Sequence, residues 1–192
     1  LWMGSVEGNL NYVSLDNPSG IFAVQDNDSE AAKKMDIINK IIFDDVNESL
    51  WLLATSGLFI YDLKESKLME YEERLTLCMG ACIDSSSRLW VSHANGLKMI
   101  DLVSMKTRDY PGVPSSQVLL PDDKGMWAGT FSNGLIRIEM DSEGNMALKK
   151  YDKNDGLVDN RIRGMLRDGY HLWITTENGL SVFDTDDATF EN

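Results

Sequence analysis

A tryptophan unit that recurs along the whole chain constrains the fold more than any other feature of the sequence. The chain has five tryptophans, and each one follows a leucine or a methionine. Successive tryptophans lie about 37 to 49 residues apart, and a period of this size is typical of propellers and solenoids. The sequence therefore predicts repeats of one supersecondary unit, marked by Trp2, Trp51, Trp90, Trp127 and Trp173.

Glycine, leucine and an acidic residue keep a nearly fixed spacing from each tryptophan. A glycine follows the tryptophan by six residues in four copies and by seven in the copy that contains Trp127. In the last four copies a leucine comes next, and an aspartate or glutamate stands five residues beyond the glycine. The first copy departs from this register, with Val13 at the acidic position. The shared spacing indicates that the copies follow one backbone plan.

Each copy is predicted to form four short β-strands. In the last copy, runs of apolar and β-branched residues are separated by turn residues such as Asp168-Gly169 and Asn178-Gly179. Short runs divided in this way are typical of an all-β fold and leave little room for helices. The predicted strands of this copy are 162–166, 171–175 and 180–183, with a last strand starting at 188.

The predicted fold class is therefore all-β, a β-propeller segment. About 4.5 four-stranded blades fit into the 192 residues. The repeated tryptophans, leucines and tyrosines are expected to pack between neighbouring sheets. The predicted blade boundaries are 1–35 for a partial blade, then 36–73, 74–112, 113–153 and 154–192.

The charge of the chain argues against nucleic acid as a partner. The sequence has 31 acidic and 18 basic residues, a net charge of −13, and phosphate binding depends on lysine and arginine. No apolar run approaches the roughly 20 residues of a membrane span, so this segment is expected to make no membrane contact. Its two cysteines, Cys78 and Cys82, are predicted to share a strand and to be buried as small hydrophobic residues.

The sequence offers little for catalysis. His93 and His171 are the only histidines, and no nucleophile elbow, histidine-pair metal motif or phosphate-binding glycine loop is present. Aspartates are frequent, but they stand in turns, where they bond the backbone. We therefore predict no enzymatic activity, no catalytic residue, no metal ligand and no cofactor for this segment. A propeller lyase or hydrolase that uses His93 is the less favoured alternative.

The fifth copy carries the clearest resemblance to a known family. The runs 154–162 and 172–184 resemble the two-component regulator propeller repeat, with its Gly-Leu entry, Leu-Trp strand and Gly-Leu-x-x-Phe-Asp end. The resemblance covers almost the whole chain and is partial in the first copy. Thr175, Leu53 and Ser92 stand where the family has glycine.

This resemblance implies a setting for the chain. Such repeats form seven-bladed propellers in the periplasmic sensor region of hybrid two-component histidine kinases. The segment is therefore expected to belong to a seven-bladed ring, to sense an oligosaccharide or similar small ligand, and to act in a phosphorelay. Neighbouring blades or domains of the same chain are the expected partners, and a homodimer stays an option. A protein-interaction scaffold is the main alternative function.

The predicted ligand site lies where the loops vary most in length. In a four-stranded blade, the loops between the second and third strands share one face of the disc with the connections between blades. Amides, an arginine and an aromatic ring suit sugar hydroxyls. Structural explanations compete with this one, because three of the asparagines precede a glycine, Arg161 can pair with an acid and Phe131 can pack under its loop. The candidates are His93, Asn95, Phe131, Asn133, Asn160, Arg161 and Asn178.

Overall fold

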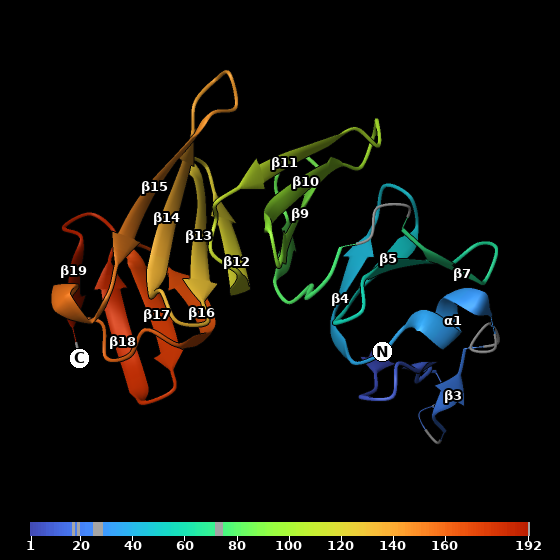
Figure 1. The fold of residues 1–192 in the computed structure, drawn as a ribbon. Helices are drawn as coiled ribbons and strands as arrows, with labels where there is room; N and C mark the ends of the chain where they lie inside the picture. The colour runs from blue at the N-terminus through green and yellow to red at the C-terminus, as the bar shows by residue number, and fades with distance from the viewer. Residues whose placement is uncertain (17, 19, 25–28, 72–74, 192) are drawn as a thin grey trace. The chain divides into compact units, whose positions relative to one another are not determined.

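The computed structural model describes residues 1–16, 18, 20–24, 29–71 and 75–191, and these residues form an all-β structure (Figure 1). The strands make five antiparallel sheets, one of three strands and four of four strands. Within each sheet the strands lie side by side in sequence order, as in the up-and-down blades of a propeller. The predicted fold class is confirmed.

The chain divides into two compact units, and the first comprises residues 1–94 and 99–108. It contains two complete sheets, β1–β3 and β4–β7, together with strands β8 (Ala81–Ile83) and β9 (Arg88–His93). The strands of the two complete sheets are β1 (Trp2–Gly4), β2 (Leu10–Tyr12), β3 (Phe22–Ala23), β4 (Ile38–Asp44), β5 (Ser49–Ala54), β6 (Leu58–Asp62) and β7 (Lys67–Glu70).

The second unit comprises residues 95–98 and 109–192 and contains the sheets β12–β15 and β16–β19. Strands β10 (Gly96–Asp101) and β11 (Thr107–Pro111) have residues in both units. The other strands of the second unit are β12 (Ser116–Asp122), β13 (Gly125–Thr130), β14 (Leu135–Met140), β15 (Met146–Tyr151), β16 (Ile162–Asp168), β17 (His171–Thr176), β18 (Gly179–Asp184) and β19 (Thr189–Glu191).

Two short helical segments complete the described structure. Helix α1 (Glu30–Lys34) begins where the Ser29 hydroxyl accepts a hydrogen bond from the Ala32 backbone N–H at 3.1 Å. The 3-10 turn η1 (Lys153–Asp155) precedes β16 and is closed by a capping box with Asp152. Neither segment, nor any other helix in the described ranges, has the length and apolar character needed to cross a bilayer.

Aspartates fix the hairpins between the first and second strands of three sheets. Asp44, Asp84 and Asp122, called here the hairpin aspartates, stand at or just after the end of the first strand. Each accepts a hydrogen bond from the backbone N–H two residues later, at 3.0, 2.9 and 2.9 Å respectively. A carboxylate that bonds its own turn in this way stabilises the reversal of the chain. The hairpins therefore place the same carboxylate at the same end of each sheet.

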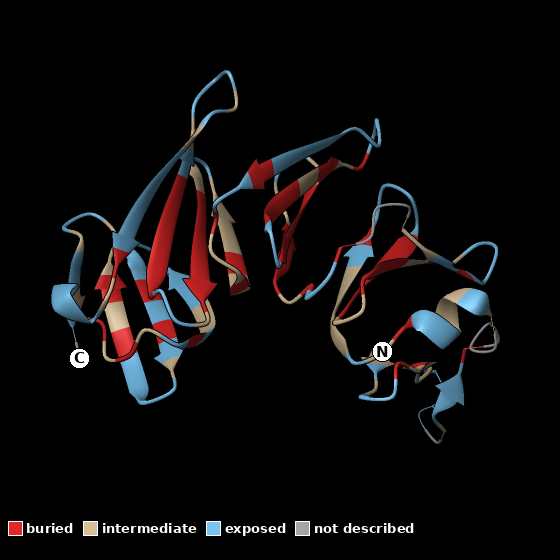
Figure 2. Cartoon of the chain, viewed as in Figure 1, coloured by how far each residue is buried: buried red, intermediate tan, exposed pale blue. Residues whose placement is uncertain are grey.

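Apolar side chains pack between consecutive sheets within each unit. The strands that carry buried residues are red in Figure 2. Trp51, Trp90 and Trp127 are almost fully buried, as the repeat pattern predicts. Trp2 is only half-buried, and Trp173 is 41% exposed on the last sheet. The tryptophans of the second, third and fourth sheets are therefore core residues, and they position the polar groups that surround them.

The prediction that Cys78 and Cys82 share a strand is wrong. Cys82 lies in β8, whereas Cys78 precedes this strand. Leu77 has a φ of 55°, so the backbone bends just before Cys78 and cannot continue as a strand. Both thiols are free and buried, as predicted.

Candidate functional site

Five of the predicted ligand residues lie together at one end of the sheets β12–β15 and β16–β19. Phe131 and Asn133 stand in the turn between β13 and β14, and Asn178 stands in the turn between β17 and β18. Asn160 and Arg161 precede β16. The backbone joins these loops, because Gly134 N–H donates to the Asn160 carbonyl at 3.0 Å and Glu177 N–H donates to the Arg161 carbonyl at 3.0 Å.

Much of the polarity of these loops holds the loops in place. The Asn160 Oδ1 accepts from the Lys153 backbone N–H at 3.0 Å, and the Asn178 side chain donates to Asp159 at 2.7 Å. Phe131 is half-buried in its turn. Groups that already have protein partners have less capacity left for a ligand. The role of these residues in ligand binding stays a prediction.

The two remaining candidates lie at the turn between β9 and β10. His93 is the last residue of β9 in the first unit and is 6% exposed. Asn95 is exposed and belongs to the second unit. The role of both residues in ligand binding also stays a prediction.

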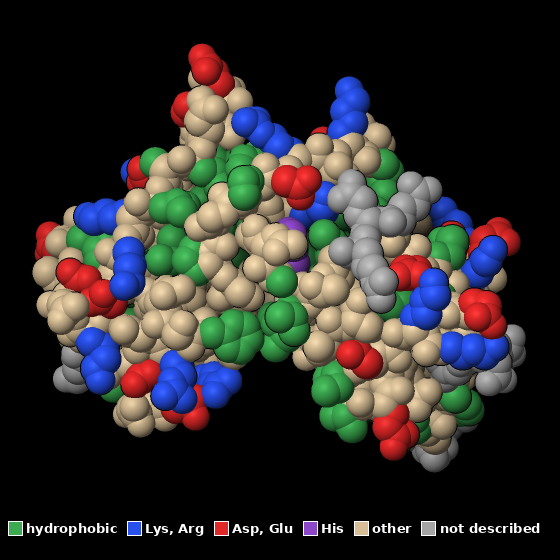
Figure 3. Space-filling view, viewed as in Figure 1, with side chains coloured by type: hydrophobic (Ala, Val, Ile, Leu, Met, Phe, Trp, Pro, Cys, Tyr) green, Lys and Arg blue, Asp and Glu red, His purple; other side chains and the backbone are tan. Residues whose placement is uncertain are grey.

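A polar pocket of about 260 Å³ lies at the opposite, hairpin end of the sheets β12–β15 and β16–β19. Its wall includes the hairpin aspartate Asp122, Trp127 and Arg137. Acidic and basic side chains are interspersed over the visible surface of the protein (Figure 3), and they also share this pocket. We call it the Trp127 pocket.

In the sheets β4–β7 and β8–β11, the tryptophan side chain donates a hydrogen bond to the hairpin aspartate. Trp51 Nε1 donates to Asp44 Oδ2 at 3.1 Å, and Trp90 Nε1 donates to Asp84 Oδ2 at 2.8 Å. These bonds satisfy the indole N–H groups, which are buried donors. In both sheets, therefore, the buried tryptophan is paired with the hairpin aspartate.

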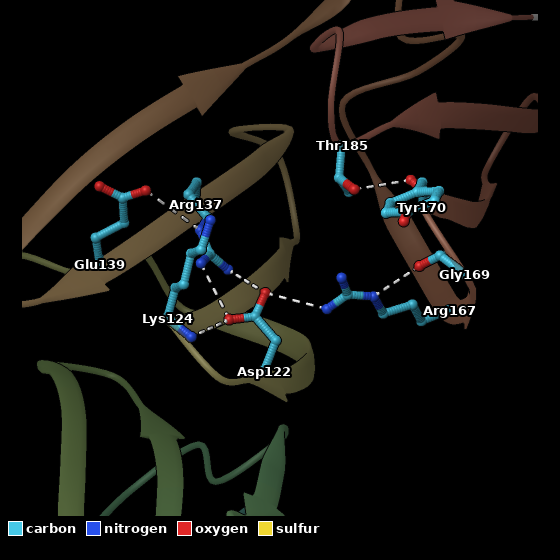
Figure 4. Close-up of polar contacts among 8 residues, drawn as sticks. All are labelled: Asp122, Lys124, Arg137, Glu139, Arg167, Gly169, Tyr170 and Thr185. Carbon is cyan, nitrogen blue, oxygen red and sulfur yellow. Dashed lines mark hydrogen bonds and ion pairs between the residues drawn. The ribbon is translucent and has the colours of Figure 1, made fainter.

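The sheet β12–β15 differs from these two sheets. Here Arg137 donates two hydrogen bonds to Asp122, Nη1 to Oδ2 at 2.6 Å and Nη2 to Oδ1 at 3.0 Å (Figure 4). Arg167 reaches the same carboxylate from β16, with Nη1 at 3.3 Å from Oδ2. Trp127 Nε1 is buried and has no hydrogen-bond partner among the described residues.

Arg137 stands where two other sheets have an aliphatic side chain. It lies opposite Trp127 in the ladder of β13 and β14. The residue opposite Trp51 is Ile60, and the residue opposite Trp173 is Val182. The Arg137 guanidinium carbon lies 4.9 Å from the centre of the Trp127 ring, a distance at which a cation and an aromatic face attract each other. Its side chain is only 8% exposed, so this charge is held inside the structure.

The charges around Asp122 keep its carboxyl group ionised. Burial raises the pKa of Asp122, but hydrogen bonds from Arg137 and the Lys124 backbone N–H and the charges of both arginines outweigh it, and the net pKa is lowered. Arg137 Nε also lies 3.7 Å from Glu139 Oε1, so two carboxylates face the two guanidinium groups. The Trp127 pocket is therefore lined by balanced charges and by a tryptophan with an unused N–H donor.

Sequence reasoning missed this pocket, although one signal was present. The position three residues after the repeat glycine is Ile60, Met99 and Val182 in three copies and Arg137 in the fourth. A charge at a position that is apolar in the other three of the last four copies marks a departure from the common plan.

Comparisons with known proteins identify the fold. No family model and no curated protein matches the chain. Among solved structures, it is similar to the extracellular domain of a protein named as a hybrid two component system from B. thetaiotaomicron, with a TM-score of 0.74 and 18% identity over 100% of this chain and 29% of that one. The extracellular domain of a protein named as a one component system from the same organism matches with a TM-score of 0.57 and 14% identity, over 100% of this chain and 34% of that one.

A eukaryotic propeller is also similar. A WD40 domain from Neurospora crassa matches with a TM-score of 0.64 and 13% identity, over 100% of this chain and 60% of that one. The chain thus spans less than two thirds of each of these structures. The propeller fold expected from the repeats is confirmed, and the bacterial neighbours are of the kind that the repeats resemble.

Proposed function

We propose that this chain is a ligand-sensing propeller segment of a periplasmic sensor that acts in two-component signal transduction. The observation that carries the proposal is the match of its whole length to the extracellular domain of a hybrid two component system. The repeat motifs of the sequence support the same setting independently. In this role the chain performs no chemistry, and a kinase elsewhere in the same protein phosphorylates the response regulator.

The proposed ligand is an oligosaccharide or a similar small polar molecule. Two features support a polar ligand: the amide-bearing loops at one end of the second unit, and the charged Trp127 pocket at the other end. A ligand shifts a sensor only when it binds one conformation more tightly than the other. The ligand is therefore proposed to bind a preferred arrangement of the propeller and to stabilise it.

One observation favours a second candidate, a surface that contacts protein. The last sheet exposes Leu166, Trp173 and Leu180, at 66%, 41% and 48%. Large apolar side chains gathered on one sheet are typical of a face that another protein surface covers. A neighbouring blade, another domain or a second copy would each fit this surface.

Thermal unfolding of the native protein that carries this chain, with a panel of oligosaccharides, tests the proposal. A ligand at 100 times its Kd is expected to stabilise the folded state by about 2.7 kcal/mol and to raise the Tm by several degrees. The same ligand should change autophosphorylation of the intact protein. If no member of the panel raises the Tm while a folded protein partner does, the scaffold function is correct instead.

A further inference from the structure

We propose that the Trp127 pocket binds a small hydroxylated carboxylate. The inference rests on the proposed sensor function and gives that function a site and a ligand class. It is carried by a buried donor without a partner, by the spare guanidinium donors beside Asp122 and by the size of the pocket.

The first step is the Trp127 indole N–H. Trp127 lines the pocket and is 5% exposed, and its Nε1 has no partner among the described residues. Buried donors are nearly always bonded, and the equivalent indoles of Trp51 and Trp90 each bond a carboxylate. The vacant position at Trp127 therefore calls for an acceptor oxygen, which a bound carboxylate supplies.

The second step is the guanidinium groups of the inner pocket. Asp122 is contacted by the guanidinium groups of both Arg137 and Arg167, and Arg137 Nε also lies 3.7 Å from Glu139 Oε1. Two carboxylates thus balance two guanidinium groups. A guanidinium has five N–H donors, and Arg137 uses two of them on Asp122. The inner pocket therefore keeps spare guanidinium donors, and hydrogen bonds from a guanidinium to a carboxylate are among the strong ones.

The third step is the mouth of the pocket. Lys124, Lys149, Asp123 and Asp186 also line the pocket, and all four are exposed to solvent. Donors and acceptors interspersed in this way suit hydroxyl groups, which do both. The volume of about 260 Å³ is below the roughly 300–1,000 Å³ of drug-sized sites, so the ligand has the size of one sugar unit.

Indole N–H signals in a ¹H–¹⁵N NMR spectrum of the chain test the proposal directly. Trp127→Phe assigns the Trp127 signal, because it removes one indole N–H and keeps an aromatic ring. Gluconate is the probe, and glucose is its uncharged control of the same carbon number. Gluconate should move the Trp127 signal downfield in a saturable manner, leave the signals of Trp51 and Trp90 in place, and bind at least tenfold more tightly than glucose.

Arg137→Ile gives the matched variant, since isoleucine is the residue of the sister sheet at Ile60. It frees Asp122 to accept the Trp127 N–H, as Asp44 does for Trp51. The variant should lose gluconate affinity at least tenfold, and its Trp127 signal should shift downfield without ligand. Arg163→Gln, which alters an arginine paired with Glu177 outside the pocket, should bind gluconate as the original chain does.

Three results would overturn the inference. A Trp127 signal that gluconate leaves unmoved removes the site, equal shifts with glucose remove the carboxylate class, and unchanged affinity in Arg137→Ile removes the role of the arginine. The sensor function has a separate failure: it falls only if no ligand of the oligosaccharide panel binds the native protein anywhere. An oligosaccharide that raises the Tm without moving the Trp127 signal refutes the pocket and leaves the sensor function standing.

Discussion

Arg137 donates two hydrogen bonds to Asp122. In two other sheets the hairpin aspartate at the equivalent position accepts a hydrogen bond from the tryptophan instead. The exchange leaves the indole N–H of Trp127 without a partner. Because the sheets are copies of one plan, each is a control for the next. The difference between them can be measured as a difference in stability.

Trp51→Phe is expected to destabilise the chain more than Trp127→Phe. Both rings are buried, but only Trp51 loses a hydrogen bond, which leaves the Asp44 carboxylate short of a donor. A bond to a charged group contributes about 1.5–3 kcal/mol, so the two variants should differ by roughly that amount. Urea unfolding followed by circular dichroism measures both. Equal losses would mean that Trp127 has a partner in solution.

Asp122→Asn is expected to lower the free energy of unfolding by about 3 kcal/mol, because it removes the nearer of two negative partners of a buried arginine. The amide keeps an acceptor, but it cannot balance the charge of Arg137. Asp186→Asn is the control, since Asp186 is an exposed residue of the same pocket. Its effect should stay within about 0.5 kcal/mol. Similar effects of the two variants would contradict the pairing.

The stabilisation by the Asp122–Arg137 pair is expected to weaken in acid. The folded pKa of Asp122 lies below its ordinary value: burial raises it, but the hydrogen bond and charge of Arg137 outweigh that effect. Its contribution to stability is therefore present above the unfolded pKa of about 3.9 and is lost as the pH falls through the folded pKa. The stability difference between the original chain and Asp122→Asn should shrink below about pH 4. A difference that stays constant down to acid unfolding would exclude this linkage.

The two cysteines are expected to resist modification in the folded chain. Burial raises the pKa of Cys78 to about 12 and, despite the opposing charge of Lys40, that of Cys82 to about 12. Because the thiolate is the nucleophile, a rise from 9 to about 12 lowers its fraction at pH 8 roughly 1,000-fold. Labelling with an aromatic disulfide reagent, with and without urea, checks this. Fast labelling of the native chain would show that these thiols are accessible.

The repeat pattern predicted the sheets because each copy places the same residue types at nearly the same spacing. Trp51 and Gly57 share their spacing with Trp90 and Gly96, so one copy supports the strand assignment of the next. Burial between sheets is harder to predict, because it depends on residues that are far apart in the sequence. His93 looked like a loop residue, yet it ends β9 and is 6% exposed, because the strand extends further than the turn residues suggested.

The Trp127 pocket lay beyond sequence reasoning for a related reason. Alternation along a strand shows that Arg137 departs from the pattern, but it does not show where the guanidinium goes. Its bond to Asp122 crosses fifteen residues and depends on the register of three strands. A pocket formed by such contacts becomes visible only when two sheets are placed together.

Gly134→Ala is expected to be much more destabilising than Gly169→Ala, although both glycines have positive φ, 80° and 58°. A Cβ at Gly134 would lie 2.3 Å from the Tyr151 carbonyl oxygen, whereas a Cβ at Gly169 would meet no atom within 4 Å. Gly169→Ala should therefore cost only the backbone term, about 1–2 kcal/mol. At Gly134 the same term is joined by a clash with the backbone of β15, and the loss should exceed about 3 kcal/mol. Urea unfolding of both variants decides the matter, and equal losses would show that the turn at Gly134 can yield without cost.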